Sequence, residues 1–219
     1  MSNSLKIKCL NIYENLAKEI IDKSSIINIK AGDLLYSKGE TADCFYFIKD
    51  GLLALIDTSP NGAEILLRVF GNNFFIGHRS FIANEEFHAS AEALKDSIVY
   101  KLPFISANDL LDQSPNILLH ITQMLARDLR MSEERLNAFN GKRVASRIID
   151  ALVFLKQRQE SYQWTRKEIG EFCGAKTETV TRTLSTLESL SLIEKDGRSI
   201  VIPDLQKLFD YKDALDLEA

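Results

Sequence analysis

The apolar positions of the chain follow two different periods, and the change from one to the other lies near residue 115. Before it, between Ile26 and Pro103, the apolar runs are short and rich in β-branched and aromatic residues, at 44–48, 52–56, 65–70 and 98–102. Turn signals at Lys49–Gly51 and Ser59–Gly62 lie between them. This pattern predicts an antiparallel sandwich or barrel. Helical spacing over Leu10–Ile21 predicts a short helix before it.

One long helix is predicted after the β region, because residues 115–139 contain no Gly and no Pro after Pro115. A heptad series with steps of four and three residues runs through Leu118, Thr122, Leu125, Leu129, Ser132, Leu136 and Phe139. This spacing predicts a seam for a partner helix and therefore a dimer. A second apolar set is expected to cover the β domain: Ile117, Ile121, Met124 and Met131. The alternative is an ordinary core helix, because two seam positions are polar.

A second compact domain is expected beyond Gly141, where residues 144–155 form another amphipathic segment. Thr165 and Glu168 have the spacing of a capping box, which predicts the start of a helix. Gly174 is then flanked by the small residue Gly170 and, six positions later, by Val180, as in a helix-turn-helix. The small residue lets two helices cross closely, and glycine can adopt the left-handed conformation of the turn.

The helix that begins near Thr177 has an outward side with the chemistry of a major-groove reader. Arg182 can contact guanine, Glu178 can accept from cytosine, and the Thr181 methyl group can contact thymine. Taken alone, Glu178 and Arg182 would fit a solvated i,i+4 ion pair better. The order of helix, turn, helix and wing favours nucleic-acid binding instead. Alternation around Asp196-Gly197 predicts a hairpin, or wing, over residues 192–202. The expected DNA-backbone contacts are Arg143, Arg166, Lys167, Lys176, Thr177, Ser185 and Arg198.

Charge and composition narrow the class of protein. The 219 residues carry a formal net charge of −4, yet residues 140–202 hold eleven basic and eight acidic side chains. The three cysteines are scattered and fit neither a disulfide framework nor a metal site. No signal peptide or membrane span is recognised, so a cytoplasmic protein is expected. Nucleotide-binding, hydrolase and metalloprotease motifs are absent and only three histidines occur, so we predict no enzyme, catalytic residue or metal ligand.

The order of these parts resembles the CRP/FNR family of bacterial transcription regulators. The motifs that carry the resemblance are Lys38-Gly-Glu40, Ala42-Asp43, Tyr46–Gly51, Gly62-Ala-Glu64, Phe75-Ile-Gly77 and Glu178–Arg182. The resemblance implies an α+β chain: a cyclic-nucleotide-binding-type β-roll (double-stranded jelly roll) over 1–114, a dimerisation helix and hinge over 115–140, and a winged helix-turn-helix over 141–219. It also implies a homodimer, a palindromic DNA operator and contact with RNA polymerase, for which residues 157–162 are a candidate loop.

Within the family, the residues Thr177, Glu178, Thr181 and Arg182 are similar to the FNR pattern. We therefore expect half-sites close to TTGAT. Lys176 departs from the Ser or Thr that usually precedes this helix, which affects the N-cap and not the reading side.

The sensed signal is not fixed by the resemblance. The positions of the family's effector pocket correspond to Gly77, His78, Arg79, Phe87, His88, Ser132 and Glu133. The arginine that neutralises a cyclic nucleotide's phosphate falls on Phe87 or His88, and neither is a permanent cation. Three scattered cysteines do not provide an iron–sulfur cluster. A haem ligand could come from His78, His88, His120 or Cys44.

No cofactor is predicted, and haem and cyclic nucleotide stay as alternatives. An unidentified ligand, a redox or protein signal, or no effector at all remain open as well. Besides a DNA-binding regulator and an enzyme, an adaptor that binds protein and not DNA is an alternative. The choice between activator and repressor also stays open.

Overall fold

The computed structural model describes residues 18–197 and 199–217. By its contacts the chain divides into two compact units. The first unit comprises Met1–Ala54 and Phe70–Met124, and the second comprises Leu55–Val69 and Leu125–Ala219. The segment Leu55–Val69, which we call the β3–β4 arm, therefore groups with the C-terminal residues.

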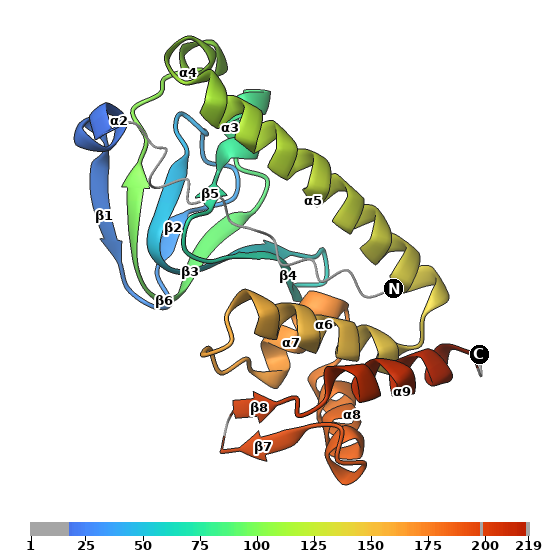
Figure 1. Ribbon diagram of the computed structural model, residues 1–219. Coiled ribbons are helices and arrows are strands. Elements are labelled where there is room, and N and C mark those ends of the chain that lie inside the picture. The colour runs from blue at the N-terminus through green and yellow to red at the C-terminus, as the bar shows by residue number, and fades with distance from the viewer. Residues whose placement is uncertain (1–17, 198, 218–219) are drawn as a thin grey trace. The chain divides into compact units, whose positions relative to one another are not determined.

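The first unit is built on antiparallel strands, as the short apolar runs predicted. Its elements are α2 (Lys18–Lys23), β1 (Ser25–Ile29), β2 (Leu34–Tyr36), β3 (Tyr46–Thr58, which continues into the arm), β5 (Phe75–Ile76), α3 (His78–Ala83), β6 (Ser90–Lys101), α4 (Ala107–Gln113) and the start of α5 (Pro115–Gly141). The sheet order is β1-β6-β3-β4, with β2 on β6 and β5 on β3 (Figure 1). The predicted leading helix lies mostly outside the described residues, and α2 ends at Lys23.

Aromatic residues fill the core of this unit. Phe45 lies 5.8 Å from both Phe75 and Phe104, measured between ring centroids. All three side chains are essentially inaccessible to solvent. Three members of the second apolar set on α5 are also buried, namely Ile117, Ile121 and Met124. The prediction that this set covers the β domain is confirmed for these residues.

The predicted turn at Lys49–Gly51 is wrong, because β3 runs through it without interruption. Gly51 has φ 136°, and a Cβ at this position would lie 2.0 Å from Ser97 Oγ. The same oxygen accepts a hydrogen bond from Leu52 N at 3.2 Å. The glycine therefore allows β6 to approach closely and does not reverse the chain. The second predicted turn is confirmed: Gly62 N donates to Ser59 O at 2.8 Å.

The second unit places helices beside a small hairpin. It contains β4 (Glu64–Phe70, all but its last residue), the rest of α5, α6 (Val144–Arg158), α7 (Arg166–Cys173), α8 (Thr177–Ser189), β7 (Glu194–Asp196), β8 (Ser199–Val201) and α9 (Leu205–Leu217). The helices α6, α7 and α8 pack on one another, as Figure 1 shows. Their buried side chains include Ile148, Leu152, Ile169, Val180 and Leu184.

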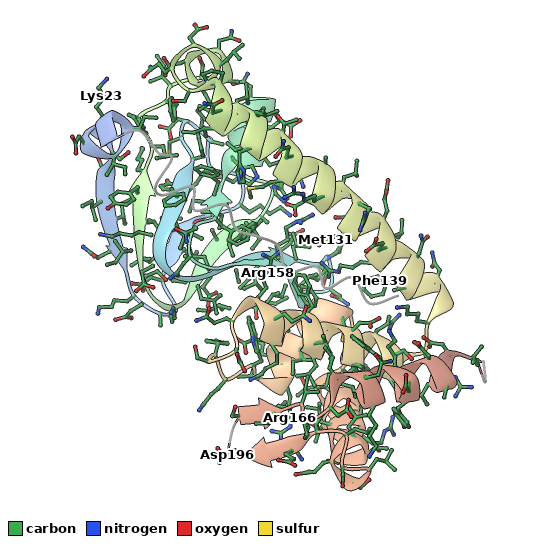
Figure 2. The ribbon with its side chains drawn as sticks, in the orientation of Figure 1. Lys23, Met131, Phe139, Arg158, Arg166 and Asp196 are labelled. Carbon is green, nitrogen blue, oxygen red and sulfur yellow. The ribbon has the colours of Figure 1, made fainter. Side chains whose placement is uncertain are left out.

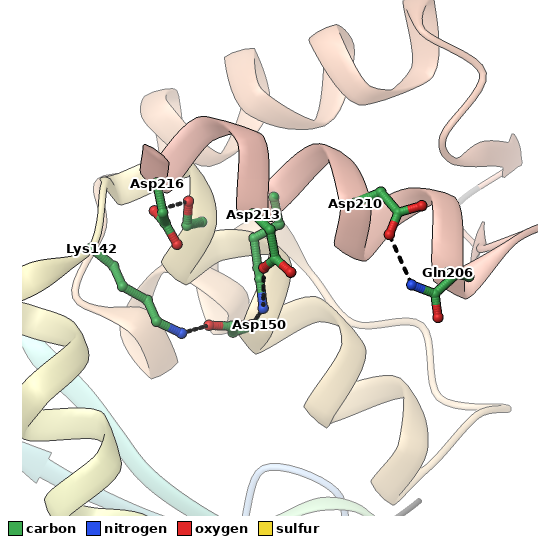
Figure 3. Close-up of polar contacts among 8 residues, drawn as sticks. Lys142, Asp150, Gln206, Asp210, Asp213 and Asp216 are labelled. Carbon is green, nitrogen blue, oxygen red and sulfur yellow. Dashed lines mark hydrogen bonds and ion pairs between the residues drawn. The ribbon is translucent and has the colours of Figure 1, made fainter. Parts of the chain in front are cut away.

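The C-terminal helix α9 is held against α6 by a hydrogen bond and an ion pair (Figure 3). Ser146 Oγ donates to Asp216 Oδ1 at 2.6 Å. The Asp150 carboxylate binds both Lys142 Nζ, at 2.6 Å, and Lys212 Nζ, at 3.1 Å. Asp150 therefore joins the residue after α5, helix α6 and helix α9.

Candidate DNA interface

The first helix of the predicted helix-turn-helix begins at a complete capping box. Thr165 Oγ1 accepts from Glu168 N at 3.1 Å, and Glu168 Oε2 accepts from Thr165 N at 2.6 Å. Two N–H groups that have no partner inside the helix are satisfied in this way. The helix ends at Gly174, which has φ 67°. The start and the end of α7 are both as predicted.

The turn between α7 and α8 depends on a second glycine. A Cβ on Gly170 would lie 2.4 Å from the carbonyl oxygen of Ala175. The same Cβ would lie 3.5 Å from Val180 Cγ2, and the Val180 side chain is fully buried between the helices. As the sequence predicted, Gly170 allows a close approach at the turn, Gly174 adopts the left-handed conformation, and Val180 fills the space between the helices.

Helix α8 has one buried side and one exposed side. Val180, Leu184 and Leu187 are at most 1% exposed. The exposed side chains include Glu178, Thr181, Arg182 and Ser185. The i,i+4 ion pairs among the described residues join Arg130 to Glu134 and Lys167 to Glu171, and Glu178–Arg182 is not one of them. The three predicted base-reading side chains thus lie together on the solvent side of α8.

Most of the predicted backbone contacts are exposed to solvent. Arg143, Arg166, Lys176, Thr177 and Ser185 are exposed, whereas Arg198 lies outside the described residues. Arg143 is the N-cap of α6, and Lys176 is the N-cap of α8 without a side-chain hydrogen bond, as expected for a lysine there. Figure 2 marks Arg166 on α7 and Asp196 at the tip of the β7–β8 hairpin.

The β7–β8 hairpin confirms the predicted wing. Lys195 pairs with Ile200, and Asp196 pairs with Ser199. Gly197 has φ 59°, a left-handed conformation that suits glycine in the tight turn.

A groove of about 310 Å³ runs beside the exposed side of α8, and sequence reasoning missed it. It is lined by Val144 and Ala145 from α6, by Thr179, Arg182, Thr183, Thr186 and Leu187 from α8, and by Tyr211 from α9. The predicted guanine reader, Arg182, therefore shares a surface with Tyr211 of the C-terminal helix.

Comparison with known proteins identifies both parts of the chain. Residues 26–114 match the family model of the cyclic nucleotide-binding domain, and residues 143–211 match that of the Crp-like helix-turn-helix domain. The chain belongs to the CRP/FNR family of transcription regulators. Its β-roll, long helix and DNA-binding helix-turn-helix are the architecture that the sequence predicted.

Relatives of this CRP/FNR regulator include the cAMP-activated global transcriptional regulator CRP of Salmonella typhimurium, 28% identical over 177 residues (77% of this chain and 84% of that protein). The transcriptional activator protein Anr of Pseudomonas protegens is 26% identical over 185 residues (80% and 75%). A solved CRP/FNR-family regulator from Thermus thermophilus has the same fold, with a TM-score of 0.73, 23% identity, and coverage of 87% of this chain and 100% of that one. No helix in the described part of the chain is both long and apolar enough to cross a membrane.

The long helix of this CRP/FNR regulator exposes much of its predicted dimer seam. Leu129 and Leu136 are 62% and 63% exposed. Thr122 and Ser132 are exposed too, and Leu118 and Leu125 are half-buried. Phe139, the last seam residue, packs against Gly174, and the Arg147 guanidinium lies 4.8 Å from the centre of its ring. The end of α5 therefore contacts the turn of the helix-turn-helix.

Aromatic rings occupy the space in front of Gly77 in the predicted effector pocket. The Phe87 and Tyr36 rings stack with centroids 3.7 Å apart, and the Tyr46 ring also stacks with that of Tyr36, at 5.9 Å. A Cβ on Gly77 would lie 3.1 Å from Phe87 Cε1. Burial raises the pKa of Tyr36 and of Tyr46 well above the ordinary tyrosine value. His78 is buried nearby in α3, Arg79 is exposed and His88 is half-buried.

The two α5 members of the predicted pocket belong to the second unit. Ser132 Oγ accepts from Arg68 Nη2 at 2.9 Å, and Arg68 Nη1 lies 2.7 Å from Asp128 Oδ1. Burial raises the pKa of Asp128 despite this partner. Glu133 is exposed. Ser132 is therefore hydrogen-bonded to Arg68, a residue of the β3–β4 arm.

The described cysteines and the candidate haem ligand His120 lie in apolar or aromatic surroundings. Cys44 and Cys173 are buried, and burial raises the pKa of both thiols. The ring of His120 lies 6.2 Å from that of Phe75. In the described residues, no three His, Cys, Asp or Glu side chains come together as metal ligands.

Arg135 is a contact residue that sequence reasoning missed. Its Nη1 donates to Leu67 O at 2.7 Å and its Nη2 donates to Phe172 O at 2.6 Å. The guanidinium also lies 4.4 Å from the centre of the Phe172 ring. Burial lowers the pKa of Arg135 from its ordinary value. One side chain of α5 thus holds the β3–β4 arm and the end of α7.

Proposed function

We propose that this CRP/FNR regulator acts as a homodimer on a palindromic operator with TTGAT-like half-sites. The observation that supports the proposal is the exposed side of α8, where Glu178, Thr181 and Arg182 lie together while the opposite side is buried. An arginine can bind O6 and N7 of guanine at once, and a glutamate can accept from N4 of cytosine. The reading helix therefore offers base contacts of the kind that the half-site requires.

The homodimer is supported by the exposed seam on α5. Leucine side chains at 129 and 136 are more than half exposed on one helix, two turns apart. A second copy of the helix could cover them by heptad packing. Two reading helices related by a twofold axis then match a palindrome whose half-sites lie about one turn of DNA apart.

The signal that the β-roll senses is proposed to be something other than a cyclic nucleotide held in the usual manner. Phe87 fills the place in front of Gly77 with an apolar ring and provides no cation for a phosphate. The named relative from Salmonella is cAMP-activated, but this chain lacks the arginine that the resemblance requires at Phe87 or His88.

The test is fluorescence anisotropy with a TTGAT-N4-ATCAA duplex and a scrambled duplex of the same composition, at two salt concentrations. We expect the ligand-free protein to bind the palindrome more tightly than the scrambled duplex. The variant Arg182→Ala should lose this preference, because each bidentate base contact discriminates by about 1–3 kcal/mol. Arg130→Ala is a matched control, since it removes one exposed arginine that pairs with Glu134 on α5. Equal binding of both duplexes at both salt concentrations would contradict the proposed operator.

A further inference from the structure

Lys167, one of the predicted DNA-backbone contacts, is already bound to a carboxylate of the β3–β4 arm. Its Nζ lies 2.6 Å from Glu64 Oε2 and 3.4 Å from Glu171 Oε1. Glu64 and Lys167 are 103 positions apart in the sequence and belong to the same unit. The hydrogen bond to Glu64 is the main reason why the pKa of Lys167 is raised. The ammonium group of Lys167 is therefore neutralised from within the chain.

The arm is held beside α7 by contacts that do not involve the charge of Glu64. Arg135 donates to the carbonyl oxygen of Leu67 on β4 and to that of Phe172 at the end of α7. Both acceptors are backbone atoms, so this link survives a substitution of Glu64. Arg135 thus keeps the two segments together whatever side chain stands at position 64.

The Lys167 ammonium group, in the first turn of α7, has an anion as its preferred partner. The N-terminal end of a helix carries partial positive charge, which adds to the positive charge of Lys167, so a neighbouring anion stabilises both. A carboxylate and a DNA phosphate are alternative anions for the same ammonium group. Glu64 lies within hydrogen-bond distance of the Lys167 ammonium group. Its negative charge would therefore repel a phosphate that approached Lys167.

We propose that the β3–β4 arm competes with the DNA backbone for α7, with the Glu64 carboxylate standing in the place of a phosphate on Lys167. DNA binding then requires Lys167 to exchange Glu64 for a phosphate. This inference rests on the proposed function, since it takes Lys167 as a backbone contact. The competition concerns phosphate and not base sequence, and it therefore weakens binding to any duplex.

The decisive variant is Glu64→Gln, which removes the charge and keeps the shape of the side chain. Both partners are well exposed, at 65% for Lys167 and 46% for Glu64, so folding should be unaffected. The control is Glu160→Gln, which makes the same change of net charge at an exposed position in the α6–α7 loop. Binding is measured by anisotropy on the scrambled duplex at low salt, where only phosphate contacts are needed.

We expect Glu64→Gln to tighten binding about two- to fivefold, the range of an exposed ion pair, and Glu160→Gln to leave it within about 1.5-fold. In a Lys167→Gln background the gain from Glu64→Gln should vanish, because the competed group is gone. An equal effect of the two glutamine variants, or a gain that persists without Lys167, would overturn the proposal. Failure of the proposed operator shows itself separately, as equal affinity of the wild-type protein for the palindrome and the scrambled duplex.

Discussion

The ring of Phe139, near the end of α5, lies against Gly174, the glycine of the helix-turn-helix turn. A Cβ at position 174 would be 2.6 Å from Phe139 Cε1, and the glycine itself has φ 67°. Position 174 therefore excludes a side chain for two reasons, the left-handed backbone and the neighbouring ring. The close packing of α5 against the turn therefore depends on the absence of a side chain at position 174.

Gly174→Ala should consequently destabilise the protein more than a glycine substitution in an open turn. We expect a loss of about 2–3 kcal/mol in the free energy of unfolding, from backbone strain together with displacement of the ring. Gly197→Ala is the matched control, because Gly197 has φ 59° and nothing within 4 Å of its Cβ position. It should cost only about 1 kcal/mol. Urea unfolding measures both values, and equal losses would show that Phe139 does not limit position 174.

The dimer seam can be tested by a polar substitution at its most exposed leucine. Leu136→Asn should raise the dimer dissociation constant about 100-fold, because each helix loses roughly 1.5 kcal/mol of apolar burial and a dimer contains two. Leu119→Asn provides a control at an α5 leucine that is 57% exposed and lies off the heptad series. Sedimentation velocity over a range of concentrations measures the effect. A dimer that is unchanged by Leu136→Asn and weakened by Leu119→Asn would place the interface on another side of α5.

The aromatic cluster at Gly77 predicts that the protein is insensitive to cyclic AMP. A ligand present at 100 times its dissociation constant stabilises the folded state by about 2.7 kcal/mol, which a thermal melt readily detects. We expect no change in Tm with millimolar cyclic AMP, since Phe87 supplies no cation for the phosphate. Phe87→Ala should itself cost about 3–5 kcal/mol, as for other buried aromatic side chains. A rise of several degrees in the wild-type Tm would contradict the prediction.

The parts of the site that the sequence predicted depend on interactions between residues that are close together in the sequence. Thr165 accepts a hydrogen bond from Glu168 three residues on, and Gly170, Gly174 and Val180 lie within eleven consecutive residues. Their spacing alone therefore carries the geometry. The alternation of buried and exposed residues along α8 is likewise a property of a single helix.

Contacts between distant segments could not be predicted in this way. The Arg135 side chain binds carbonyl groups 68 and 37 positions away, and a backbone carbonyl leaves no trace in the sequence. Glu64 and Lys167 are ordinary surface residues until the fold brings them together. The error at Gly51 has another cause: Lys-Asp-Gly is a turn signature, but a glycine with positive φ also serves where a neighbouring strand approaches closely.

The fastening of α9 to α6 sets a limit on where the DNA-binding part of the chain can be shortened. Leu208 is completely buried, and Asp216, in the last described turn, accepts a hydrogen bond from Ser146. A chain ending after the wing, near residue 203, would uncover the apolar surface that Leu208 covers and leave Asp150 with Lys142 alone. It would also remove Tyr211 from the groove beside Arg182. A fragment that keeps these contacts therefore has to extend past the wing and include α9 as far as Asp216.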